Sequence, residues 1–104
     1  RKNAGTARMS RLIWAAGAIY GLGKIHRFLA EKDSRAAAKA LDAIRKGANV
    51  LLQFPQAGRP AEDLEPEHRE LLIPFGASGY VIFYETLEND VCILAVKHQK
   101  EAGY

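Results

Sequence analysis

The C-terminal residues combine side chains that could bind an anionic partner or transfer a proton. Lys97, His98 and Lys100 place positive charge and an imidazole close in sequence to the aromatic ring of Tyr104. An imidazole can act as a general acid or base, and cations beside an aromatic ring suit an acidic protein surface or a nucleic-acid end. We therefore treat Lys97, His98, Lys100 and Tyr104 as candidate target-binding residues. A frayed chain end is the simpler alternative.

Arg59, between Gly58 and Pro60, is a further cation in a suggestive setting. Its guanidinium could pair with a phosphate or with a carboxylate of a partner. We favour a structural arginine that ties its loop to Glu70 or to the acidic stretch that follows. The residues of that stretch do not have the spacing of a zinc or calcium site, so we expect no metal and no cofactor. They are Glu62, Asp63, Glu65, Glu67 and His68.

The composition indicates one folded domain. A chain of 104 residues can build one hydrophobic core, and 48% hydrophobic with 26% charged residues is typical of folded proteins. The single cysteine, Cys92, excludes an intrachain disulfide and favours the reducing cytoplasm. The apolar stretch from Leu12 to Leu22 is too short to span a membrane, so we expect no membrane partner.

The positive net charge is concentrated at the N-terminus. The formal net charge is +3, and Arg1, Lys2 and Arg8 precede Met9. We expect residues 1–8 to be a cloning remnant or a disordered leader, and residues 9–104 to be the domain. Without those three cations, 12 Lys and Arg remain against 12 Asp and Glu. A domain with no net charge lacks the broad footprint of a general nucleic-acid binder, so we expect no strong direct nucleic-acid binding.

The first half of the chain predicts a strand and two helices. A short strand is expected over residues 11–14, with Trp14 in the core. Helical spacing of apolar residues then predicts a helix from about Ala15 to Lys32 and a second one, capped by Ser34, that ends before Pro55. The short link makes them an antiparallel hairpin. The expected core stripes are Ala15, Ile19, Leu22, Ile25 and Leu29, and Ala37, Leu41, Ile44, Ala48 and Leu51.

The second half predicts three strands over residues 70–75, 80–86 and 91–97, joined by short links into an antiparallel meander. The last two do not alternate polar with apolar residues, which is typical of strands buried on both faces. Two helices cover only one face, so the other face would bind a partner. Alternatively, the small sheet curves and the chain covers both faces itself. The fold class is α+β.

This order of elements, read with particular residues, resembles the RelE/ParE toxin superfamily. The residues are Pro55, Gly58-Arg59-Pro60, Arg69-Glu70-Leu71, Gly79-Tyr80, Tyr84, and the last strand from Val91 through Ile93, Leu94 and Val96 to His98. The resemblance implies an N-terminal strand, an antiparallel two-helix hairpin and a three-stranded antiparallel meander packed on the hairpin. It also implies the toxin of a type II toxin-antitoxin pair, bound by a ParD-like antitoxin.

The resemblance further separates two modes of action. Leu72, Pro74 and Val81 stand where RelE-type nucleases carry basic catalytic residues. RNA cleavage needs a base, an acid and cations, and these three apolar residues supply none of them. The resemblance therefore favours the ParE branch, whose members poison DNA gyrase without catalytic residues. The alternative is a ribosome-dependent mRNA endoribonuclease that uses Arg59, His98 and Tyr104. A binding domain without toxicity is a third class. Candidate antitoxin contacts are Tyr80, Ile82, Tyr84, Leu94 and Arg59.

Overall fold

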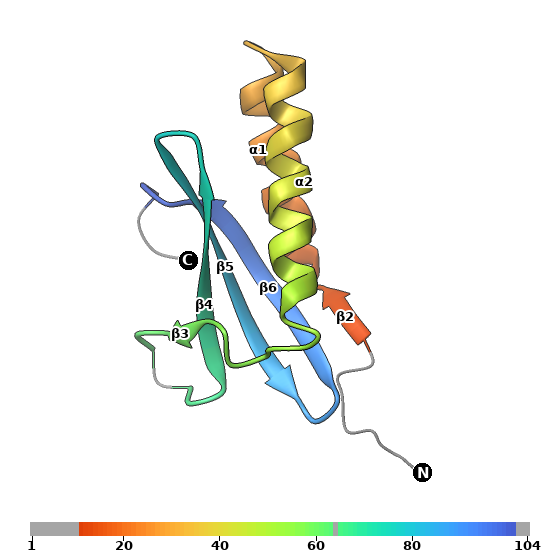
Figure 1. Cartoon of the computed structure of the whole chain (residues 1–104), viewed down its shortest axis with the longest axis vertical. Helices are drawn as coiled ribbons and strands as arrows, with labels where there is room; N and C mark the ends of the chain where they lie inside the picture. Colours follow the sequence, from red (N-terminus) through yellow and green to blue (C-terminus); the bar gives the residue numbers. More distant parts are fainter. Residues whose placement is uncertain (1–10, 64, 102–104) are drawn as a thin grey trace.

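The computed structural model describes residues 11–63 and 65–101. Residues 1–8 and Tyr104, on which expectations were placed, lie outside this part. The α+β class and the expected order of elements are confirmed (Figure 1). The elements are β2 (Arg11–Trp14), α1 (Ala16–Ala30), α2 (Ser34–Val50), β3 (Arg59–Pro60), β4 (His68–Phe75), β5 (Ser78–Leu87) and β6 (Asp90–His98).

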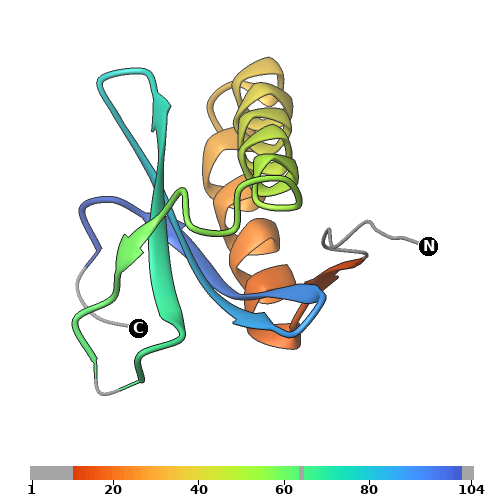
Figure 2. The ribbon, with the colours of Figure 1, turned by 60° about the horizontal axis from the view of Figure 1, so that its bottom comes forward.

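One five-stranded sheet carries the fold, with the strand order β2-β6-β5-β4-β3. Strands β4, β5 and β6 form the expected antiparallel meander, and β2 joins its edge parallel to β6. The two-residue strand β3 was not expected; Arg59 pairs with Glu70 and Pro60 with Arg69 at the opposite edge. The helix hairpin lies against one face of the sheet, which we call the helix face (Figure 2). The opposite face is called the open face.

Helix α1 lies close to β6 because small residues face the strand. Ala18 and Gly21 are buried there, and a Cβ on Gly21 would overlap the carbonyl oxygen of Val96. Leu22 and Leu29 of the expected core stripe pack against the core. Ile19 was expected in the core and is 58% exposed, whereas Ile25 is buried as expected. The bulky side chain of Ile19 would not fit the short distance between helix and strand.

Helix α2 follows after a short turn. Its N-cap is Asp33 rather than Ser34: the Asp33 carboxylate accepts hydrogen bonds from the backbone N–H groups of Arg35 and Ala36. The helix ends at Val50, so the segment before Pro55 is a turn. Its buried residues are Ala37, Ala40, Ile44 and Ala48, with Leu51 buried just beyond its end.

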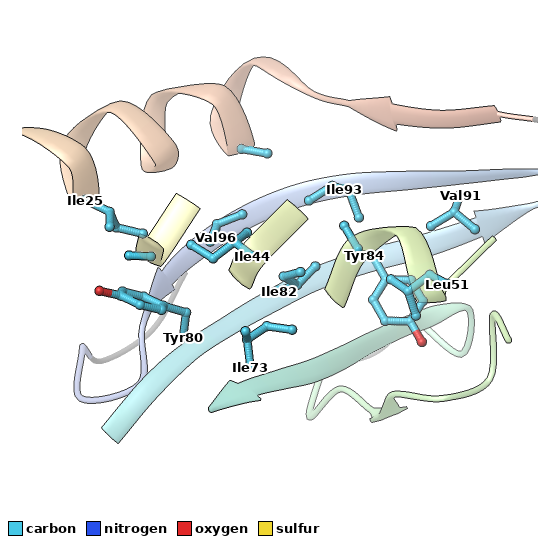
Figure 3. Packing of buried hydrophobic residues seen from close by; sticks show 13 residues of the cluster. Ile25, Ile44, Leu51, Ile73, Tyr80, Ile82, Tyr84, Val91, Ile93 and Val96 are labelled. Carbon is cyan, nitrogen blue, oxygen red and sulfur yellow. The ribbon is translucent and has the colours of Figure 1, made fainter. Parts of the chain in front are cut away.

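The hydrophobic core lies between the hairpin and the helix face of β5 and β6 (Figure 3). Burying each large apolar side chain stabilises the fold by about 1.5–3 kcal/mol. Trp14 packs against this core but is only partly buried. On the open face, Val81 is only 6% exposed although no helix covers it. The chain itself therefore buries part of the open face, which accounts for some of the apolar residues on that side of β5 and β6.

No helix within residues 11–63 and 65–101 has both the length and the apolar character needed to cross a membrane.

Candidate functional site

A groove of about 630 Å³ lies where the C-terminal half of α1 meets the β4–β5 turn and the end of β6. We call it the tail groove. Its lining is mainly apolar, with two lysines, a glutamate and His98 among the polar groups. The lining residues are Lys24, Ile25, Phe28, Leu29, Phe75, Ser78, Tyr80, His98, Lys100 and Glu101. His98 and Lys100, two of the candidate target-binding residues, therefore share one concave surface.

The imidazole of His98 is held in one tautomer by its neighbours. The backbone N–H of Lys100 donates to Nδ1 at 3.1 Å, so Nδ1 carries the lone pair. Nε2 then carries the proton and donates to the Ser78 hydroxyl at 3.0 Å. The ring also meets the Tyr80 ring edge to face, with centroids 5.5 Å apart. A general base needs a free lone pair, and in this arrangement that lone pair is already engaged.

The chain remains anchored beyond β6 as far as Glu101. The backbone N–H of Gln99 donates to the Gly79 carbonyl at 2.9 Å. The carboxylate of Glu101 accepts from the His98 backbone N–H at 2.9 Å and from Lys24 Nζ at 3.4 Å. The hydrogen bond from His98, followed by the charge of Lys24, lowers the pKa of Glu101. Lys100 and Glu101 are thus part of the groove wall, and residues 99–101 are not a frayed end.

Lys97 and Arg59 belong to the open face. In the antiparallel register, Leu72, Val81 and Lys97 stand side by side, and a shallow hollow there also includes Arg59. Lys97 Nζ donates to the backbone carbonyl of Glu101 at 3.0 Å. Arg59 Nε lies 3.3 Å from a carboxylate oxygen of Glu70, so the expected structural pairing of this arginine is confirmed.

Arg59 and His98, the two described residues of the alternative nuclease set, are not brought together. His98 pairs with Tyr80 in register and faces the helices, whereas Arg59 pairs with Glu70 and lines the hollow of the open face. Tyr104 lies outside the described residues. Arg59 and His98 therefore cannot act on the same phosphate in this conformation.

Three of the candidate antitoxin contacts are core residues. Tyr80, Ile82 and Tyr84 point toward the helices and are buried (Figure 3). Ile82 and Tyr84 are therefore not accessible to a partner, whereas Tyr80 borders the tail groove. The Tyr84 hydroxyl donates to the Pro55 carbonyl at 2.7 Å and accepts from the Gly58 N–H at 3.0 Å. Burial raises the pKa of Tyr84. Leu94 is half-buried at an irregularity in the β5–β6 pairing.

A charged cluster that sequence spacing did not predict lies at the end of β4 and β5 that is remote from the tail groove. His68 Nδ1 is 2.7 Å from a carboxylate oxygen of Asp63, and Nε2 is 3.2 Å from one of Glu85. The hydrogen bond with Asp63 is the main cause that raises the pKa of His68, and it lowers the pKa of Asp63. His68 and Glu85 are directly opposite in the register. Only a known strand pairing could have revealed this contact.

Comparison with known proteins finds one matching family model and two similar toxins. The family model of the ParE toxin of the type II toxin-antitoxin system parDE matches residues 12–103. Toxin RelE3 of Caulobacter vibrioides is 35% identical over 80 residues, covering 77% of this chain and 84% of that toxin. Toxin RelE1 of the same organism is 36% identical over 74 residues, covering 71% and 76%.

The fold also matches a solved structure, described as the chromosomal ParDE toxin-antitoxin system from P. aeruginosa. The TM-score is 0.73 at 23% identity, covering 89% of this chain and 98% of that chain. This likeness supports the fold, and the family model extends over nearly all of the described residues. The chain therefore belongs to the ParE toxin family of type II toxin-antitoxin systems, a family that implies a cognate antitoxin.

Proposed function

We propose that this toxin acts in the cytoplasm and arrests growth by poisoning DNA gyrase, without chemistry of its own. The observation that carries the proposal is the apolar centre of the open face. By the resemblance to the superfamily, Leu72, Pro74 and Val81 stand where its nuclease branch carries basic catalytic residues, and Leu72 and Val81 are paired across β4 and β5. Apolar side chains supply neither the proton transfers nor the cationic stabilisation that RNA cleavage needs.

The tail groove is the surface we assign to the target. Its apolar floor includes Phe28 and Tyr80, and its lysines, Lys24 and Lys100, suit an acidic protein surface. His98 contributes through its fixed orientation rather than as a base. Lys97, on the open face beside the same tail, remains a candidate for the edge of the contact.

A ParD-like antitoxin would cover the helix hairpin. Large apolar side chains are exposed on α1 at Ile19, Tyr20 and Phe28, and near the end of α2 at Val50 and Phe54. Burial of each of these side chains by a partner would contribute on the order of 2 kcal/mol, and exposed apolar patches of this kind mark interaction sites. Because Phe28 also lines the tail groove, an antitoxin on α1 would obstruct the target surface. Arg59 and Leu94 remain candidate contacts at the sheet.

The second candidate function is a ribosome-dependent mRNA endoribonuclease. The observation in its favour is the name of the two relatives, RelE3 and RelE1, at 35% and 36% identity. In this alternative His98 would act within the tail groove, after giving up the hydrogen bond from the Lys100 backbone.

Two assays with the purified chain separate these functions. Inhibition of gyrase supercoiling, with intact mRNA in a translating extract, supports the poison. Codon-dependent mRNA cuts without an effect on gyrase would establish the nuclease instead. Lys100→Glu should weaken gyrase inhibition severalfold. Lys39→Glu, at an exposed position on α2 away from the groove, should not.

A further inference from the structure

A group of metal-ligating side chains lies apart from the tail groove. Glu67 immediately precedes β4, His68 is the first residue of β4, and Glu85 is opposite His68 near the end of β5. The groove is at the other end of these strands and on the helix face. This group, which we call the His68 cluster, therefore has no part in the function proposed above.

The ligand atoms are close enough to share one ion. One donor atom from each of Glu67, His68 and Glu85 lies within 4.8 Å of the others. The separation of His68 Nε2 and the Glu85 carboxylate oxygen is 3.2 Å. Zinc–nitrogen and zinc–oxygen bonds of about 2.0–2.1 Å place neighbouring tetrahedral ligands about 3.3 Å apart. Two of the ligands are thus already spaced for zinc, and the exposed Glu67 needs to move by roughly 1.5 Å at most.

The orientation of the imidazole is already set. Asp63 holds Nδ1 at 2.7 Å, and the ring packs edge to face on Phe83 with centroids 5.0 Å apart. A histidine that donates its second N–H to a carboxylate is the usual arrangement around zinc, because the carboxylate fixes the ring and increases its basicity. Nε2 is consequently directed toward Glu85, where an ion would lie.

We propose that Glu67, His68 and Glu85 form a zinc-binding site, in which Asp63 is a positioning residue and water completes the coordination. An imidazole with two carboxylates selects zinc-like transition metals over Mg²⁺ and Ca²⁺, which prefer oxygen ligands alone. Three protein ligands plus water make an open site. The bound ion would link Glu67, which precedes β4, to Glu85 on β5.

Calorimetric titration of the full chain with Zn²⁺ tests this proposal. We expect saturable binding of one ion per chain and much weaker binding of Mg²⁺. His68→Ala should raise the dissociation constant at least tenfold, and Asp63→Asn by about 10–100-fold through loss of the orienting carboxylate. Glu67→Gln tests a ligand at an exposed position where the fold is not at risk. It should also weaken binding.

Two matched controls exclude other sites. Glu62→Gln removes an acidic group from the same segment, and Cys92→Ser removes the thiol opposite Glu85 in the β5–β6 register. Neither residue belongs to the His68 cluster, so both variants should bind Zn²⁺ as the parent does. A urea melt without metal verifies that every variant is folded.

Nitrogen NMR of the histidine rings gives a second readout. Zn²⁺ should shift the Nε2 resonance of His68 and leave those of His26 and His98 unchanged. Zinc binding that survives unchanged in both His68→Ala and Glu67→Gln would overturn the proposal. So would the absence of saturable binding, equal affinity for Mg²⁺, or a shift at His98 in place of His68.

Discussion

Replacing Tyr84 by phenylalanine removes one hydroxyl from the interior of the domain while keeping the ring. Tyr84 is fully buried, and its hydroxyl bridges the Pro55 carbonyl and the Gly58 N–H at 2.7 and 3.0 Å. Together with the hydrogen bond from Arg69 to the Gly58 carbonyl, these bonds tie the loop after α2 to the sheet, immediately before Arg59. The substitution leaves a donor and an acceptor without their shared partner.

The expected cost follows from these two groups. A typical hydrogen bond contributes about 0.5–1.5 kcal/mol net, and a buried group left unsatisfied costs about 1–3 kcal/mol. We therefore expect Tyr84→Phe to lower the free energy of unfolding by about 2–3 kcal/mol. A small domain has roughly 5–15 kcal/mol in total, and each kcal/mol moves the melting temperature of a chain of this size by about 4–8 °C. The melting temperature should fall by about 10–20 °C.

Urea denaturation followed by circular dichroism measures this loss, and Tyr20→Phe is the matched control. Tyr20 is 67% exposed, so losing its hydroxyl should change the stability by less than about 0.5 kcal/mol. Antitoxin affinity, measured where Tyr84→Phe is folded, should stay within about threefold of the parent. A stability loss below 0.5 kcal/mol for Tyr84→Phe would refute the reasoning, because the bridging hydroxyl would then carry no net energy.

Three further predictions concern α1, the tail and the sheet. Gly21→Ala should destabilise the domain by about 1–3 kcal/mol in a thermal melt because its Cβ overlaps β6, whereas Gly23→Ala should stabilise it by up to about 1 kcal/mol. Glu101→Gln should lower stability at pH 7. Since the pKa of Glu101 is lowered in the fold, the difference between the two proteins should shrink as the pH falls below about 4 in pH-dependent melts. Leu94→Asp should unfold the domain or abolish antitoxin pull-down; a folded variant that still binds would contradict this.

The elements of the fold were predictable because their apolar periodicities are strong. The errors arose where close packing or a short pairing decided the outcome. Ile19 was assigned to the core from spacing alone, but α1 approaches β6 closely at Gly21 and leaves Ile19 58% exposed. Strand β3 has two residues, one of them Pro60, and no periodicity can be read from so short a segment.

The candidate sites were predictable only where neighbours in sequence form them. His98 and Lys100 were identified in one segment, and the structure places both in the tail groove. The contribution of α1 to that groove, through Lys24 and Phe28, required the tertiary fold. Likewise, Glu85 joins His68 through the strand register, 17 residues away, so the sequence spacing of the acidic loop did not indicate the cluster.

Gyrase-mediated DNA cleavage is the most direct measurement of the central claim. Purified gyrase, ATP and supercoiled plasmid are incubated with increasing toxin, the reactions are stopped with detergent and protease, and linear DNA is quantified. We predict that linear DNA increases with toxin and that toxin mixed first with its antitoxin has no effect. Unchanged cleavage and unchanged supercoiling at micromolar toxin would contradict the assignment of gyrase as the target.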